Sequence, residues 1–129
     1  MPKSTPIMSC AVQAGFASAA DEHIENFLDL NKLVVKHPAA TFFVRVAGDS
    51  MKDAGIHPGD ILVVDRSLTP VSGKIVIACL DGEFTVKRLV MQAKSVRLVA
   101  ANADYADIKI EKNSDFRVWG VVTHVIHAC

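Results

Sequence analysis

Two residues of this chain have side chains and surroundings suited to chemistry, a serine in a glycine–aspartate turn and a lysine in a strand-like segment. Ser50 follows Gly48-Asp49 directly after an apolar, β-branched run. A serine hydroxyl at a strand end is exposed, and it becomes a nucleophile when a nearby base takes its proton. The backbone N–H groups of Ser50 and of a neighbour, Asp49 or Met51, can form an oxyanion hole at such a turn. An ordinary Asx turn or helix N-cap has the same pattern, so the turn alone does not decide between the two interpretations.

Lys87 is the candidate base, and it lies in the middle of the segment EFTVKRLV, residues 83–90. Side chains alternate along a strand, so Thr85, Lys87 and Leu89 share one face. If that face points inward, desolvation lowers the pKa of the lysine. A neutral amine can then accept the serine proton and later donate it to the leaving amine. The alternative is a solvated lysine on an edge strand, because buried lysine is rare.

Histidine is the usual base for a catalytic serine, and the chain contains five histidines. None lies in a recognisable catalytic sequence context, but Ser-His pairing depends on geometry, so the sequence leaves it open for His23, His37, His57, His124 and His127. A metal cluster of His124, His127 and Cys129 is not expected, because residues three apart on a strand face opposite sides and no fourth ligand is nearby. We therefore expect no metal and no cofactor.

The elements that must position these residues are mainly β-strands. Asp81-Gly82 favours a type I′ turn and makes the segments on either side of it the clearest hairpin. Short strands at this spacing predict a compact antiparallel sheet or barrel. The β-branched and aromatic runs, separated by turn residues, cover residues 41–47, 60–66, 74–80, 83–90, 95–101 and 116–126.

The first 30 residues differ in character from the rest. Residues 1–20 are small, polar and alanine-rich, which is typical of a flexible arm. Residues 21–31 carry apolar side chains at i, i+3 and i+4, which indicates a short helix or turn. We expect a flexible, cleavable arm over residues 1–30 and a β domain over residues 31–129.

Charge and composition narrow the classes of function. Lysine plus arginine equals aspartate plus glutamate at 14 each. A DNA-coating protein carries a basic excess, so no direct sequence-specific DNA binding is expected. Apolar runs fall short of the ~18 residues that span a membrane, and Pro6 and Ser9 interrupt the segment where a signal peptide would lie. The odd set of Cys10, Cys79 and Cys129 indicates free thiols, so we expect a cytoplasmic protein.

Three motifs in a fixed order resemble the LexA-type peptidases. They are FFVRVAGDSM, HPGDILVVD and GEFTVKRL, and the likeness extends to WGVVTHV near the C-terminus. In that family the serine of the first motif is the nucleophile and the lysine of the third is the general base. The resemblance therefore implies a LexA-type peptidase fold with a catalytic dyad of Ser50 and Lys87.

Within that family the chain is most similar to the UmuD-type proteins. LexA and phage repressors place a helix-turn-helix domain before the peptidase, and residues 1–40 show no two-helix pattern. UmuD-type proteins carry a short arm that they cut at a small-residue–glycine bond, and Ala14-Gly15 fits that pattern. The resemblance implies that a RecA–single-stranded DNA filament stimulates this cleavage. It also implies a shortened homodimer that works with a UmuC-type polymerase subunit in translesion synthesis during the SOS response.

Two other functions stay open on the sequence. A non-catalytic binding module of the same fold would act only as a polymerase accessory protein, and it predicts that Ser50 and Lys87 are apart or that the arm never reaches the cleft. A signal-peptidase-like enzyme also uses Ser-Lys chemistry, but it needs a membrane anchor or a large exposed apolar surface.

Overall fold

The computed structural model describes residues 4–8 and 24–129 of the chain. It contains two compact units, Met1–Lys36 and His37–Cys129, each of which is described by itself. No helix among the described residues is both long enough and apolar enough to cross a membrane.

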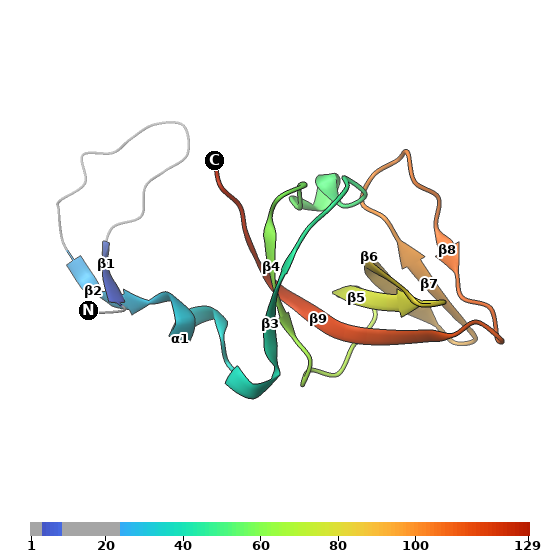
Figure 1. Ribbon diagram of the computed structural model, residues 1–129, viewed down its shortest axis with the longest axis horizontal. Coiled ribbons are helices and arrows are strands. Elements are labelled where there is room, and N and C mark those ends of the chain that lie inside the picture. Colours follow the sequence, from blue (N-terminus) through green and yellow to red (C-terminus); the bar gives the residue numbers. More distant parts are fainter. Residues whose placement is uncertain (1–3, 9–23) are drawn as a thin grey trace. The chain divides into compact units, whose positions relative to one another are not determined.

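An antiparallel sheet of seven strands forms the frame of the unit His37–Cys129 (Figure 1). The strand order is β3-β4-β9-β5-β6-β7-β8, so the last strand of the chain lies between β4 and β5. The predicted mainly-β, antiparallel fold is confirmed. The strands are β3 (Thr41–Arg45), β4 (Ile61–Asp65), β5 (Ile75–Leu80), β6 (Glu83–Gln92), β7 (Ser95–Val99), β8 (Ile108–Lys109) and β9 (Phe116–Ile126).

Strand β5 is buried on both faces of the sheet. Val76 and Ala78 are fully buried and pack in one core with residues such as Leu89 and Leu98. Ile77, on the opposite face, belongs to a second core with Val46, Met51, Ile56, Leu62 and Val64. Because successive side chains alternate between faces, a strand between two cores must be apolar at consecutive positions, as this segment is.

The β5–β6 hairpin closes through the dipeptide predicted to form its turn. Asp81 and Gly82 both have positive φ, 50° and 85°, which a type I′ turn requires. The turn sets the register in which Leu80 is opposite Glu83 and Val76 is opposite Lys87. The predicted hairpin is confirmed, and its register places Lys87 beside a fully buried position.

Strand β9 passes close to the side chains of β4 at a glycine. Gly120 is opposite Ile77 of β5. A Cβ atom at Gly120 would lie 2.5 Å from Cγ1 of Val64 and 3.3 Å from Cγ of Arg66. Val64 is fully buried and cannot move aside easily. The middle of the sheet therefore requires glycine at this position.

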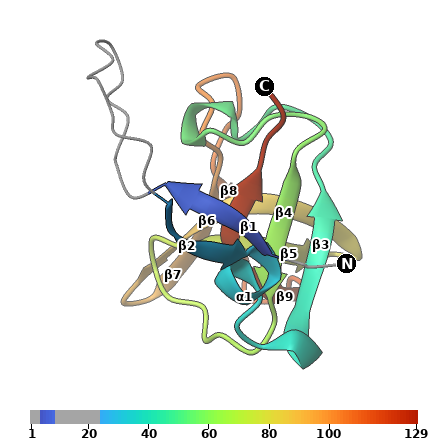
Figure 2. The same cartoon turned by 90° about the vertical axis from the view of Figure 1, so that its left-hand side faces the viewer.

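The unit Met1–Lys36 contains a strand pair and a short helix. Strands β1 (Ser4–Met8) and β2 (Ile24–Asp29) pair antiparallel, as Figure 2 shows. Helix α1 (Leu30–Val34) begins after Asp29, whose side chain accepts a hydrogen bond from the Asn31 N–H at 3.0 Å.

The short helix or turn expected over residues 21–31 is wrong for most of the segment, because residues 24–29 form strand β2. A helix this short is marginal by itself, and pairing with β1 satisfies the backbone groups of the segment instead. Of the expected flexible arm, residues 4–8 are described as β1 and residues 24–29 as β2, while residues 9–23 lie outside the described residues.

Gly120→Ala is expected to lower the free energy of unfolding by ~1–3 kcal/mol, because an added methyl group overpacks the core. Urea denaturation of the two proteins measures the difference. Val64→Ala makes room for the new methyl group, so the double variant should lose less stability than the sum of the two single losses. Additive losses would show that the close approach to Val64 does not explain the glycine.

Candidate active site

Ser50 lies in a turn between β3 and a 3-10 helix, η2 (Lys52–Ala54). Gly48, at φ +80°, provides the left-handed conformation that lets the chain reverse after β3. Met51 is 1% exposed and fixes the turn in the core that contains Ile77. The serine side chain is therefore half-buried and held between a sharp turn and an anchored residue.

The structure brings Ser50 and Lys87 together. Lys87, on β6, is 7% exposed, and its Nζ lies 2.9 Å from Oγ of Ser50. The same nitrogen lies 2.7 Å from Oγ1 of Thr85 and 3.1 Å from the carbonyl oxygen of Val86. All three partners are neutral, and among the described residues no carboxylate forms a salt bridge with this amine.

Burial lowers the pKa of Lys87 below the ordinary lysine value of 10.5, because desolvation disfavours the ammonium form. A neutral amine has two N–H donors and one lone pair. The Val86 carbonyl can only accept a hydrogen bond, and the Thr85 hydroxyl can accept the second. The lone pair is then left for the Ser50 hydroxyl, which is the arrangement a general base needs.

Thr85 is a contact residue that the sequence analysis placed on the face of Lys87 without giving it a role. Its hydroxyl fixes the direction of the lysine side chain at the site. Spacing of two along a strand was the available signal, but the sequence does not show that the long lysine side chain bends back to this hydroxyl.

The predicted oxyanion-hole donors make no backbone hydrogen bond within the described residues. Among the hydrogen bonds of the described residues, the backbone N–H groups of Asp49, Ser50 and Met51 donate none, whereas that of Lys52 donates to the Asp49 carbonyl at 3.2 Å. Free N–H groups beside a serine hydroxyl can stabilise the negative oxygen of a tetrahedral intermediate. The choice of partner for the Ser50 amide, Asp49 or Met51, stays a prediction.

A pocket of about 230 Å³ adjoins Ser50. Its walls come from the end of β3 and the segment after it, and from β4, β5 and the start of β6. The lining is largely aliphatic, so it suits a short segment with small side chains. The lining residues are Val44, Arg45, Val46, Ala47, Ser50, Leu62, Ile77, Phe84, Thr85 and Val86.

The histidines in the described part of the chain are not bonded to Ser50. His37 contacts Asp65 at 2.6 Å and His127 contacts Asp60 at 2.5 Å. The pKa of Asp60 is lowered chiefly by His127. That of Asp65 is lowered to about 2, first by the Ser67 hydroxyl and then by His37.

The other two described histidines, His57 and His124, are not bonded to Ser50 either. The ring of His57 lies against that of His127, and His124 contacts Thr123. His23, Ala14 and Gly15 lie outside the described residues. Over residues 4–8 and 24–129, no group of three or more His, Cys, Asp or Glu side chains is placed to hold a metal ion.

Comparison with known proteins assigns the family. The sequence matches the family described as Peptidase S24-like over residues 6–123. The chain belongs to this family. MucA of Salmonella typhimurium is 46% identical over 94% of this chain and 83% of MucA. SamA of Salmonella typhimurium (strain LT2) is 45% identical over 98% of this chain and 91% of SamA.

The LexA repressor of Psychromonas ingrahamii is 39% identical over 89% of this chain. The matched region makes up only 55% of the repressor's own length. The predicted resemblance to LexA-type peptidases is confirmed. The S24-like family is a family of serine peptidases, and in this member the Ser50–Lys87 contact lies beside the pocket.

Lys87→Met is expected to raise stability at neutral pH when both proteins carry Ser50→Ala. Below the folded-state pKa of Lys87 both states are protonated, and the native state carries the cost of a desolvated ammonium. As pH rises through that pKa towards 10.5, the unfolded state binds more protons, so the lysine protein gains stability. Urea denaturation at pH 7 and pH 10.5 should show the advantage of methionine shrinking with pH.

Lys94→Met, at an exposed position, is the control for the loss of one charge. An equal effect of the two substitutions at both pH values would contradict the desolvation of Lys87.

Proposed function

We propose that the protein is a self-cleaving serine peptidase that removes its own N-terminal arm at the Ala14–Gly15 bond. The observation that supports this most is the 2.9 Å contact between Nζ of Lys87 and Oγ of Ser50. A lysine so buried, with only neutral partners, is poised to work as a base. The pocket beside it and membership of a serine-peptidase family support the same conclusion.

The reaction begins with neutral Lys87. Its lone pair takes the proton of Ser50 as Oγ attacks the carbonyl carbon of Ala14. The oxygen of the tetrahedral intermediate becomes negative and is held by the Ser50 amide with that of Asp49 or Met51. As the C–N bond breaks, Lys87 gives its proton to the nitrogen of Gly15, which leaves as a free amine.

The acyl-enzyme is then hydrolysed by water. Neutral Lys87 takes a proton from the water as its oxygen attacks the acyl carbon. The ester C–O bond breaks, Lys87 returns the proton to Oγ of Ser50, and the Ala14 carboxylate is released. Ser50 and Lys87 return to their starting protonation states, and the chain has lost residues 1–14.

The substrate suits the pocket in size. Alanine and glycine flank the scissile bond, so an extended arm can enter a narrow aliphatic pocket without a large side chain to accommodate. Because the arm is tethered to the domain, its effective concentration is high and modest binding is enough. We place the cleavable arm within residues 1–30 and the peptidase domain in residues 31–129.

The biological setting is proposed from the resemblance to UmuD-type proteins and from the similarity to MucA, SamA and LexA repressor. A RecA–single-stranded DNA filament stimulates the cleavage by favouring the productive state of the arm or of Lys87. The processed protein is a cytoplasmic homodimer that binds a UmuC-type polymerase subunit and supports error-prone translesion synthesis in the SOS response.

Self-cleavage is expected to rise with pH, with a midpoint below 10.5, because neutral Lys87 is the active form. Mass spectrometry of the purified protein should show loss of residues 1–14. Ser50→Ala and Lys87→Ala should abolish cleavage. Lys87→Arg should too, because an arginine stays protonated across this range.

If the folded wild type stays intact at alkaline pH and also with RecA filament, the peptidase proposal fails. The non-catalytic binding module would then be the better description.

Gly15→Val is expected to slow self-cleavage ~100-fold, because a branched side chain beside the scissile bond displaces it from Ser50. The first-order rate constant at alkaline pH measures the effect. Ala20→Val makes a similar change away from the bond and should leave the rate within ~2-fold of wild type, since it does not alter the geometry of attack. Equal rates for Gly15→Val and wild type would show that the scissile bond is not Ala14–Gly15.

A further inference from the structure

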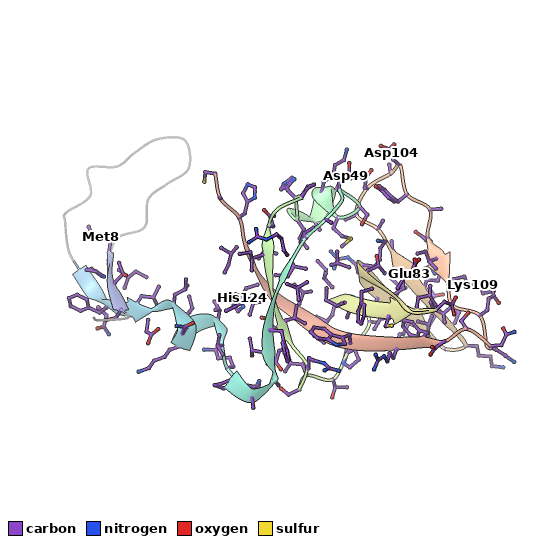
Figure 3. All side chains as sticks on the ribbon, in the orientation of Figure 1. Met8, Asp49, Glu83, Asp104, Lys109 and His124 are labelled. Atoms are coloured by element: carbon purple, nitrogen blue, oxygen red, sulfur yellow. The ribbon has the colours of Figure 1, made fainter. Side chains whose placement is uncertain are left out.

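The turn that carries Ser50 is attached to a second loop, residues 100–105 between β7 and β8. Figure 3 shows Asp49 and Asp104 on these two neighbouring segments. Asn102 is 5% exposed, and its side-chain nitrogen donates to the carbonyl oxygen of Asp49 at 3.0 Å. Its side-chain oxygen accepts the N–H of Asp104 at 3.0 Å. Both ends of this buried carboxamide are therefore committed, one to its own loop and one to the serine turn.

The orientation of the Asp49 carbonyl determines that of the Ser50 N–H, because the peptide group is planar. This carbonyl and the N–H of Ser50 belong to the same peptide plane. In a trans peptide the C=O and N–H bonds point in opposite directions. Holding the oxygen of Asp49 therefore sets the direction of the Ser50 N–H, which is a donor of the proposed oxyanion hole.

Three further contacts join the same two segments. The Tyr105 hydroxyl donates to Oδ1 of Asp49 at 2.8 Å. The N–H of Asp53 donates to the Ala101 carbonyl at 2.8 Å, and the Ala101 N–H lies 3.3 Å from the sulfur of Met51. Residues before and after Ser50 are thus tied to loop 100–105, while the amide of Ser50 stays free of partners among the described residues.

We propose that Asn102 is a positioning residue for the oxyanion hole, acting through the Asp49–Ser50 peptide plane. It touches neither Ser50 Oγ nor Lys87 and takes no part in proton transfer. It aims the Ser50 N–H at the place where negative charge develops, and Tyr105 supports it through the Asp49 side chain. This inference rests on the proposed function, since an oxyanion hole has meaning only if Ser50 attacks a carbonyl.

Asn102→Asp is the sharpest test of this role. The side chain keeps its shape and its bond to the Asp104 N–H, but it loses the donor and turns a second oxygen toward the Asp49 carbonyl. The limiting rate of self-cleavage at high pH, where Lys87 is neutral, should fall ~10-fold or more, because loss of one oxyanion donor costs about 10²–10³. Asn113→Asp makes the same chemical change at an exposed position and should cleave like wild type.

The pH profile separates positioning of the Ser50 amide from an effect on the base. A charge that acted only on Lys87 would move the midpoint and leave the limiting rate intact, and that result would overturn the proposal. So would a limiting rate within ~2-fold of wild type in folded Asn102→Asp, given that an aligned oxyanion donor is worth far more. Circular dichroism reports whether each variant is folded.

Tyr105→Phe provides a second test that does not depend on the buried position. It removes one exposed hydroxyl and keeps the ring, and it should lower the limiting rate ~2–5-fold with an unchanged midpoint, because it loosens the turn by one hydrogen bond. If Asn102→Asp does not fold and Tyr105→Phe cleaves at the wild-type rate, the proposal is wrong. If wild type itself never cleaves, the proposed function has failed rather than this inference.

Discussion

The desolvated amine of Lys87 is the constraint on which the site depends. An ammonium group with neutral partners alone is costly to bury, and that cost lowers its pKa and makes the neutral amine accessible. Thr85, Val86 and Ser50 supply the three partners that a neutral amine can use, two acceptors and one hydroxyl donor. A carboxylate in place of any of them would keep the lysine charged and end its usefulness as a base.

The sheet makes this arrangement possible by bringing three distant parts of the chain to one place. Strand β3 leads into the turn of Ser50, β6 carries Lys87, and the segment after β7 holds Asn102. Strand β5, buried on both faces, fixes the register of β6 against two cores. Strand β9 can close the middle of the sheet because Gly120 leaves room for Val64. Lys87, Ser50 and the turn are thus fixed by packing that lies outside the site.

In the proposed self-cleavage, a site anchored in this way makes access of the arm one step that can vary. The Ser50 turn is anchored by Met51 on one side and by loop 100–105 on the other. A pocket of about 230 Å³ adjoins Ser50. In the proposed reaction the substrate is tethered and needs little affinity, so a partner that favours entry of the arm would control the rate without changing the chemistry.

Features that depend on neighbouring residues could be predicted from the amino-acid sequence. Alternating apolar runs marked the strands, Asp81-Gly82 marked the hairpin, and the ordered motifs around Ser50 and Lys87 indicated the family. Prediction from the sequence was wrong where the short-range pattern is ambiguous. Residues 24–29 have apolar side chains at helical spacing, but they form a strand that pairs with β1. The neutral partners of Lys87 and the hydrogen bond from Asn102 to Asp49 could be seen only in the three-dimensional packing. The contacts of Lys87 with Ser50 and of Asn102 with Asp49 join residues 37 and 53 positions apart in the chain, and no local periodicity encodes the direction of a buried side chain.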